Sequence, residues 1–430
     1  MAKAQNLFDT AKLELDSIAQ ILETSYSDKN VVHSDKKGLH SDKKRFHKAI
    51  NLLKRPQNQI RKKLIVKLSN GKKKVFHSLR VQYNDANGPF MGGLRFDSDF
   101  NEENIKALAF HEALKSSIAN ISFGGAFGVI GVDINKVSLK DKEIISKMFS
   151  QFLTPFIGVW KDIITTEKGT DEKTSLWMME SFERRKKMHS PASFTSNIAK
   201  LDGAIFILHS FLKSINYSTM FRKLDVSIHG FGNRGYLFAK NLTAQNFRVV
   251  AISDSTGGIV NSSGFDVEEI KKLKDKFGSL KEVSIMQKIE YVANIDLLKL
   301  PVDMLLVASK ENVITRENAD TITAKNILEI ANFAITKDAE QILLKKSINI
   351  LPDLFLNSGF SILAYLEWIQ KTHGYKWSRE EVNKKLHISM SKIFEDVKIL
   401  VDDKKISYRE ACLYLGVKRI IDAMMDRGRV

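Results

Sequence analysis

Hydrophobic residues recur with helical spacing along much of the chain. Apolar positions three and four residues apart run through residues 104–121, 141–160 and 197–214, a pattern that predicts amphipathic helices. Two partly alternating runs within residues 63–84 flank Ser-Asn-Gly and predict a β-hairpin. The tail, residues 377–430, is predicted to be helical, with an apolar face formed by Ala411, Leu415, Val417, Ile420, Ile421 and Met424.

Short apolar runs alternate with helical stretches from about residue 225 onward. The first run leads directly into Gly230-Phe231-Gly232-Asn233-Arg234-Gly235, and a second, residues 248–253, ends at Asp254. Further apolar runs follow at residues 302–308 and 327–330. A strand, a helix and a strand in this order indicate an α/β fold with a doubly wound sheet.

Residues 33–45 differ from both patterns, because they repeat the letters HSDKK almost in tandem and contain few apolar residues. We expect a surface insertion that joins an N-terminal helix to the body of the protein.

Length and composition limit the class of protein. At 430 residues the chain exceeds the size at which single cores usually divide, so two domains are expected. No apolar run approaches 18 residues and the N-terminus is amphipathic with acidic residues, so neither a membrane span nor a secretory signal is expected. Cys412 is the single cysteine, and no Cys/His cluster has the spacing of a metal site. These features favour a cytoplasmic protein without a metal.

The net charge of +17 raises the alternative of a nucleic-acid-binding surface. The basic residues are spread along the chain, however, with modest clusters at residues 61–63, 72–74 and 184–187 and no interleaved aromatic residues. A generic basic surface is therefore favoured over nucleic-acid binding.

The glycine motif has the context of a dinucleotide-binding turn. Gly230 permits the tight turn, Gly232 lets the backbone approach a pyrophosphate, and Gly235 lets helix and strand pack closely. Asp254 could accept hydrogen bonds from the adenosine ribose, and its charge would repel a 2′-phosphate, which favours NAD over NADP. The alternative is a Rossmann fold retained without a ligand, in which Asp254 only closes a turn.

Several segments together resemble the glutamate/leucine/phenylalanine/valine dehydrogenases. They are RVQYNDANGPFMGGLRF, IKALAFHEALKSSIANISFGGAFGVIGVD, IHGFGNRG, SDSTGGI, ILEIANFAIT, ILPDLFLNSGF and ACLYLGVKRIIDAMMDRG, in the family's order from Leu52 onward. The resemblance implies two domains across a cleft, NAD(P)-linked oxidative deamination of an L-amino acid, and usually a homohexamer.

The resemblance also implies domain boundaries and cofactor contacts. Residues 1–195, joined by a C-terminal helix at 400–430, would form a substrate and oligomerisation domain, and residues 196–399 a Rossmann domain. Besides the glycines and Asp254, the implied cofactor contacts are Asn233, Ser255, Asn312 and Asn332.

The substrate side of the site is only partly preserved. Lys115 matches the helix lysine that binds the substrate α-carboxylate in the family, although a solvent lysine on an amphipathic helix is the simpler alternative. Met91, before Gly92 and Gly93, stands where glutamate enzymes have a lysine, and Ala364 stands where they have a serine. Leucine-type enzymes are also apolar at the first of these places, so an apolar ligand side chain is implied.

The catalytic groups depart further from the family. Phe127 occupies the place of the catalytic lysine, and Glu167 that of the catalytic aspartate. Losing a positioned acid–base group typically costs about 10²–10⁴ in rate, and a carboxylate moved by roughly an ångström can cost about 10² more. Glu167 alone is a weak signal, because exposed loop glutamates are common.

Three further differences fall in the implied cleft. Lys200 occupies a place where the family has a threonine, Phe360 one where it has a glycine, and Glu112 one where it has a neutral amide. We therefore predict a catalytically impaired family member that binds nucleotide and acts as a regulatory or structural subunit, in its own hexamer or with an active paralogue. The alternative is an active NAD-dependent dehydrogenase for an apolar amino acid, with Lys200 or Glu167 replacing the lost group.

Overall fold

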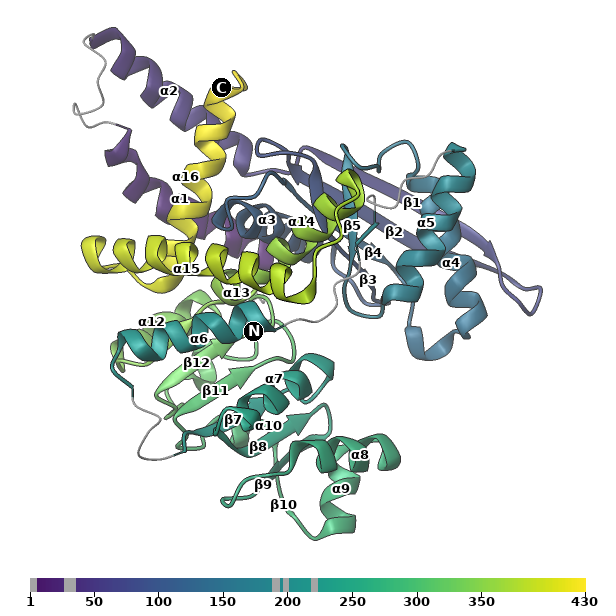
Figure 1. Cartoon of the computed structure of the whole chain (residues 1–430), viewed down its shortest axis with the longest axis vertical. Helices are drawn as coiled ribbons and strands as arrows, with labels where there is room; N and C mark the ends of the chain where they lie inside the picture. The colour runs from purple at the N-terminus through teal and green to yellow at the C-terminus, as the bar shows by residue number, and fades with distance from the viewer. Residues whose placement is uncertain (1–5, 27–35, 188–193, 196–200, 218–222) are drawn as a thin grey trace. The chain divides into compact units, whose positions relative to one another are not determined.

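The computed structural model describes residues 6–26, 36–187, 194–195, 201–217 and 223–430, and it divides the chain into two compact units (Figure 1). Unit 1 comprises Met1–Lys200 with Ser358–Val430, and unit 2 comprises Leu201–Asn357. The predicted two-domain α/β fold is confirmed. Unit 2 ends at Asn357, whereas the Rossmann domain expected from the sequence extends to residue 399.

The sheet of unit 1 has the strand order β1-β2-β4-β3-β5-β6. The first three strands in this order are antiparallel, and β4, β3, β5 and β6 are parallel to one another. The strands are β1 (Asn58–Lys67), β2 (Lys73–Asn84), β3 (Phe90–Phe96), β4 (Gly125–Ile130), β5 (Asp162–Thr166) and β6 (Phe194–Thr195). The predicted hairpin is β1–β2, and its turn closes at Gly71, whose φ of +85° favours glycine.

The helices of unit 1 are α1 (Leu7–Ser25), α2 (Lys36–Leu53), α3 (Glu102–Ile118), α4 (Leu139–Leu153), α5 (Glu172–Lys186), α14 (Ser358–His373), α15 (Arg379–Lys404) and α16 (Tyr408–Asp426), with a 3₁₀ turn at Ile134–Lys136. Both α14 and α16 pack against α3. Ser117 Oγ donates to the Gly416 carbonyl at 2.8 Å, and the Arg419 guanidinium donates to the carbonyls at the end of α3. These contacts place the C-terminal helices in unit 1 and explain its boundary.

Two predicted elements need correction. The helix expected over residues 141–160 ends at Leu153, because Pro155 has no N–H with which to continue the helical hydrogen bonds. The insertion expected over residues 33–45 is helical from Lys36, as the first half of α2, while residues 33–35 lie outside the described part of the chain. Side chains on the apolar face predicted for α16 are buried except Leu415, which is half-buried.

Unit 2 is a seven-stranded sheet in the order β10-β9-β8-β7-β11-β12-β13. The strands from β8 to β13 in this order are parallel, while β9 and β10 run antiparallel at one edge. The strands are β7 (Asp225–His229), β8 (Arg248–Asp254), β9 (Gly257–Val260), β10 (Glu290–Val292), β11 (Met304–Val307), β12 (Asn326–Glu329) and β13 (Asn349–Leu351). The strands predicted from residues 225, 248, 302 and 327 are thus confirmed.

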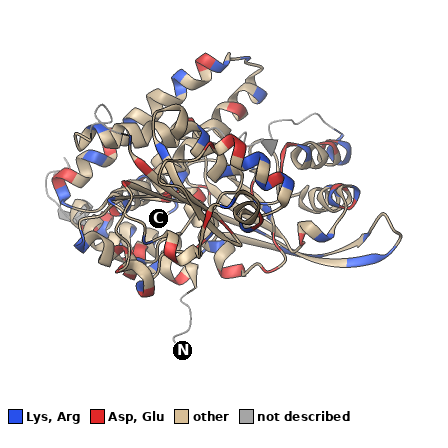
Figure 2. Cartoon of the chain, turned by 90° about the horizontal axis from the view of Figure 1, so that it is seen from below, with Lys and Arg blue, Asp and Glu red and all other residues tan. Residues whose placement is uncertain are grey.

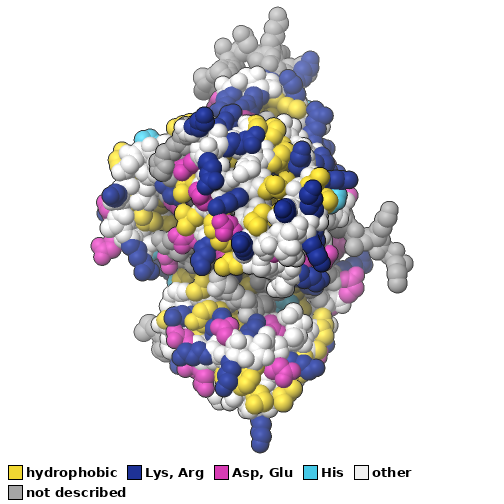
Figure 3. All heavy atoms as spheres, turned by 90° about the vertical axis from the view of Figure 1, so that its right-hand side faces the viewer, with side chains coloured by type: hydrophobic (Ala, Val, Ile, Leu, Met, Phe, Trp, Pro, Cys, Tyr) yellow, Lys and Arg dark blue, Asp and Glu magenta, His cyan; other side chains and the backbone are white. Residues whose placement is uncertain are grey.

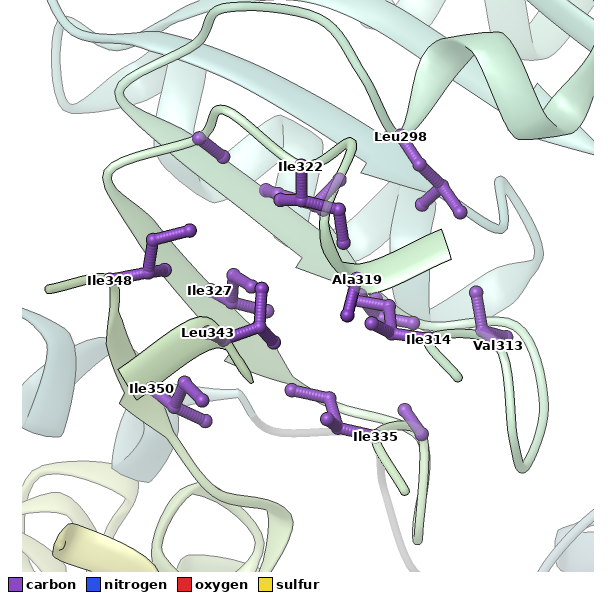
Figure 4. Packing of buried hydrophobic residues seen from close by; sticks show 14 of the residues in the cluster. Leu298, Val313, Ile314, Ala319, Ile322, Ile327, Ile335, Leu343, Ile348 and Ile350 are labelled. Carbon is purple, nitrogen blue, oxygen red and sulfur yellow. The ribbon is translucent and has the colours of Figure 1, made fainter. Parts of the chain in front are cut away.

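The helices of unit 2 are α6 (Asp202–Ser214), α7 (Asn233–Ala244), α8 (Val267–Phe277), α9 (Leu280–Gln287), α10 (Asn294–Leu297), α11 (Arg316–Ala319), α12 (Lys337–Lys345) and α13 (Asp353–Leu356). Its core contains Ile327 of β12, Leu343 of α12 and Ile350 of β13, which lie close together in Figure 4. All three are almost fully buried. This packing fixes the carboxyl ends of the parallel strands, where ligands bind in such sheets.

Charged residues are distributed over both units (Figure 2). Basic residues concentrate at the end of the β1–β2 hairpin, where Lys67, Lys72, Lys73 and Lys74 lie close in sequence. On the face shown in Figure 3, lysine and arginine side chains are interspersed with acidic and hydrophobic ones. Among the described helices, none combines the length and apolar character that a membrane span requires.

Candidate functional site

The glycines of β3 lie against β4 in unit 1. A Cβ added to Gly92 would come within 1.6 Å of the Ala126 carbonyl oxygen, so no other residue fits there without moving the strand. A Cβ on Gly93 would lie 2.9 Å from the Phe127 ring and 3.1 Å from Glu167. The structure therefore brings the predicted residues Gly93, Phe127 and Glu167 together.

Phe127 is fully buried on β4. The guanidinium carbon of Arg95 lies 5.0 Å from the centre of its ring, in the geometry of a cation–π contact. The phenyl ring has no titratable group, so Phe127 contributes packing and a cation–π contact at this position.

Glu167 follows β5 and is held by its surroundings. Arg95 Nε donates to its carboxylate at 3.1 Å, and the Lys168 backbone N–H donates to the same oxygen at 2.5 Å. The turn behind it is fixed by Thr170, which accepts from the Glu167 N–H and donates to the Leu94 carbonyl. The carboxylate that could serve as a base is thus already in an ion pair.

Lys115 is buried on α3 and paired with Glu112, one turn earlier, at 2.5 Å. A Cβ on Gly92 would come within 3.0 Å of Glu112 Cγ, which places this pair beside β3. Glu112 therefore provides Lys115 with a partner carboxylate from within the chain.

The remaining predicted residues of unit 1 fall on three elements. Met91 is buried on β3, opposite Ile163 of β5, and Ala364 is buried on α14, which packs against α3. Phe360 is half-buried on α14. Lys200 lies outside the described residues.

A buried ion pair beside β3 was not predicted from the sequence. The Arg80 guanidinium, fully buried, makes two hydrogen bonds to the Asp162 carboxylate, at 3.0 and 2.5 Å. It also donates to the carbonyls of Gly92 and Gly93 at 3.1 and 2.9 Å. Gln82 Nε2 donates to Asp162 at 2.9 Å. The sequence signal that could have indicated this pair is the presence of Arg80 and Gln82 among the apolar residues of β2.

The glycine turn of unit 2 has the geometry its sequence predicts. Gly230 has a φ of +109°, and a Cβ there would lie 2.6 Å from the Ser309 nitrogen. A Cβ on Gly235 would lie 2.0 Å from the Gly230 carbonyl oxygen, so strand and helix touch here. A Cβ on Gly232 would meet no atom within 4 Å. The middle glycine therefore faces open space.

Helix α7 begins at Asn233, immediately after this open position. Its N-cap is Gly232, and no side chain caps it among the described residues. Asn233 is exposed. The first N–H groups of a helix have no intrahelical partner and carry partial positive charge, so this end suits a phosphate group.

Asp254 at the end of β8 accepts four hydrogen bonds. The backbone and hydroxyl of Thr256 donate to Oδ1 at 2.9 and 2.6 Å, while the Leu280 backbone and Lys274 Nζ each approach Oδ2 to 3.0 Å. Partial burial would raise the pKa of Asp254, but the hydrogen bonds from Thr256, Leu280 and Lys274 outweigh it and keep the pKa below its usual value. Ser255, next to it, is exposed.

Two predicted asparagines lie in adjacent loops. Asn312 has a left-handed φ of +52°, and its N–H donates to the Phe333 carbonyl, in the residue after Asn332, at 2.8 Å. The Asn332 Oδ1 atom is buried and has no hydrogen-bond partner within the described part of the chain. A buried acceptor of this kind costs free energy unless a ligand or water satisfies it.

His229, directly before the glycine turn, was not predicted. Its Nδ1 lies 2.8 Å from Ser309 Oγ. Burial lowers the pKa of His229 to about 4, against a backbone hydrogen bond that acts in the opposite direction. The neutral imidazole therefore joins the ends of β7 and the loop after β11.

These features of unit 2 fit a dinucleotide. The open Gly232, the uncapped start of α7 and the unsatisfied Asn332 oxygen each leave room or hydrogen-bonding capacity for a ligand. Unit 1 differs, because the charged groups Lys115 and Glu167 each have a partner within the chain.

Comparison with known proteins gives matches in both units. A family model described as Glutamate/Leucine/Phenylalanine/Valine dehydrogenase matches residues 200–428, and one for the dimerisation domain of that family matches residues 56–184. An NAD-specific glutamate dehydrogenase of Staphylococcus aureus is 32% identical over 389 residues, covering 88% of this chain and 92% of that protein.

Two solved structures show how far the fold agrees. The hetero-hexameric glutamate dehydrogenase from Thermus thermophilus, in a Leu-bound form, superposes with a TM-score of 0.86 at 25% identity, over 98% of this chain and 97% of that one. The glutamate dehydrogenase from Peptoniphilus asaccharolyticus gives a TM-score of 0.77 at 26% identity, over 99% and 100%.

Proposed function

The chain belongs to the glutamate/leucine/phenylalanine/valine dehydrogenase family, and from this premise we propose that it is a catalytically impaired member that binds NAD. It acts as a regulatory or structural subunit in the cytoplasm. The observation that carries the proposal is the contact of Arg95 with both the buried Phe127 ring and the half-buried Glu167 carboxylate.

The cluster removes two roles that oxidative deamination requires. Phe127 supplies neither a proton nor a positive charge for a developing oxyanion. The first loss typically costs a factor of about 10²–10⁴ in rate, and the second about 10²–10³. Glu167 is bound to Arg95, so using it as a base means breaking a partly buried ion pair. For this reason we do not favour an active dehydrogenase in which Glu167 replaces the lysine.

Nucleotide binding is assigned to unit 2. The start of α7 would hold the pyrophosphate near Gly232, Asp254 and Ser255 would lie on the adenosine side, and Asn312 and Asn332 would contact the remainder. NAD, when bound, supplies a hydride acceptor. The chain's own part is to bind and orient it, and the NAD-specific relative supports this choice of cofactor.

The ligand of unit 1 and the assembly complete the proposal. Met91 and Ala364 are both apolar and buried, which favours a ligand with an apolar side chain over glutamate. The family's dimerisation domain and the hetero-hexameric assembly of the Thermus thermophilus relative support an oligomer, either a hexamer of this chain or one shared with an active paralogue.

The test combines binding and turnover on the same preparation. NADH binding is measured by fluorescence titration, and NADH production is followed with glutamate, leucine, valine and phenylalanine. We expect saturable binding without turnover. An ordinary enzymatic rate of about 1–10³ per second with any of these substrates would contradict the proposal.

The variants Phe127→Lys and Phe127→Lys with Arg95→Met separate lost chemistry from lost structure. A lysine at 127 would lie beside the Arg95 guanidinium, so we expect detectable leucine oxidation only in the double variant, and only weakly. Phe127→Met controls for packing, and NADH binding reports whether each variant is folded.

A further inference from the structure

Lys274 connects three parts of the nucleotide-binding unit. It lies on α8 seven residues after Val267 and four after Ile270, the two buried residues of that helix, so all three share one face. Its ammonium lies 3.0 Å from Asp254 Oδ2 and 2.9 Å from the Phe231 carbonyl oxygen. Phe231 stands between the first two glycines of the turn.

This geometry changes the charge at the end of β8. The sequence presented Asp254 as a bare carboxylate that would repel a 2′-phosphate. In the structure its charge is balanced by Lys274, and each of its four acceptor positions is occupied from within the chain. The carboxylate therefore has no acceptor position left for a ribose diol unless an internal partner is displaced.

The ammonium itself retains hydrogen-bonding capacity. Lysine has three N–H donors, and Asp254 and Phe231 take two of them. The Lys274 side chain is 19% exposed, so the remaining donor can reach a ligand. In Rossmann folds that bind NADP, a nearby arginine accommodates the 2′-phosphate, and the Lys274 ammonium brings a positive charge to the corresponding place.

We propose that Lys274 determines nucleotide specificity, and that it lets the site accept NADP(H) as well as NAD(H). The inference rests on the proposed nucleotide binding and deepens it. Lys274 neutralises Asp254 and binds the 2′-phosphate, while the glycine turn holds the pyrophosphate common to both nucleotides.

The experiment is a pair of fluorescence titrations, with NADH and with NADPH, on the full chain and three variants. For the unmodified protein we expect the two Kd values to agree within about tenfold. In Lys274→Met the Kd for NADPH should rise at least tenfold relative to that for NADH, the loss typical of one charge-assisted hydrogen bond. Lys274→Arg should keep the unmodified ratio.

Lys271→Met is the matched control. Lys271 lies on the same helix, but it pairs with Asp275 one turn later, so its loss should leave the ratio unchanged. Should Lys274→Met not fold, Lys274→Gln repeats the test, because glutamine removes the charge and keeps a donor for the Phe231 carbonyl.

The outcomes separate the two proposals. If neither nucleotide binds to folded protein, the proposed function fails. If NADH binds and NADPH binds at least 100 times more weakly, or if Lys274→Met leaves the ratio unchanged, only the role of Lys274 is overturned.

Discussion

Each unit contains a cluster of glycines, and the two clusters differ in what occupies the space beside them. In unit 1, a Cβ on Gly92, Gly93 or Gly128 would meet the chain itself within 3.1 Å. In unit 2, Gly230 and Gly235 are similarly enclosed, but Gly232 between them is open. Glycines therefore mark close approach in both units, and only the second leaves that space for a ligand.

Polar groups show the same difference. The charges nearest the unit 1 glycines are bound within the chain, as Arg80 to Asp162 and Arg95 to Glu167. Near the unit 2 glycines a helix start is uncapped and the Asn332 oxygen is unsatisfied. The comparison indicates a structural role for the first cluster and a binding role for the second.

The largest expected effect is on the stability of unit 1. Replacing Asp162 by the near-isosteric asparagine leaves the buried Arg80 guanidinium without its counter-charge, so the free energy of unfolding should fall by about 3–5 kcal/mol. All four tryptophans (Trp160, Trp177, Trp368 and Trp377) belong to unit 1, so tryptophan fluorescence during urea denaturation reports on this unit alone.

Arg61→Gln is the control for this experiment. Arg61 forms an exposed ion pair with Glu102 at 2.7 Å, and its loss should cost less than about 1 kcal/mol. Equal effects of the two variants would show that the Arg80–Asp162 pair does not support the glycine strand.

A smaller effect concerns pH and His229. Because its pKa is about 4 in the folded protein and near 6.5 when unfolded, the unfolded state binds more protons between these values. Stability should therefore fall as pH drops from about 6.5 to about 4, by up to about 3 kcal/mol. His229→Gln should flatten this dependence in melting curves followed by circular dichroism.

His209→Gln provides the comparison within unit 2, because His209 lies exposed on α6 whereas His229 is buried. If both histidine variants alter the pH dependence equally, the buried His229 is not its source.

The smallest effect concerns binding alone. Gly232 has an ordinary extended backbone and open space beside it, so Gly232→Val should fold normally. The added side chain would occupy the pyrophosphate space, and the Kd for NADH should rise about tenfold or more, a change of about 1.4 kcal/mol. Gly235→Val should instead destabilise unit 2, because its Cβ would clash with the Gly230 carbonyl.

Local patterns predicted most elements of the fold. Strand spacing and the glycine motif located β7, α7 and β8 because their chemistry lies within thirty residues of sequence. Pairings across long separations were not predictable in this way. Arg80 and Asp162 are 82 residues apart, and nothing in a single sequence indicates that one neutralises the other. Lys274 is close to Asp254 in sequence, but the two meet through the packing of α8, which the glycine motif does not specify.

The divided sequence of unit 1 has a consequence for how the protein is made. Ser117 and its partner Gly416 are 299 residues apart, so at a synthesis rate of ~5–20 residues per second the ribosome exposes α3 roughly 15–60 s before α16. Unit 2, a continuous segment, can complete its sheet in that interval. The surface of α3 that α16 covers is exposed meanwhile, and exposed apolar surface of this kind favours aggregation.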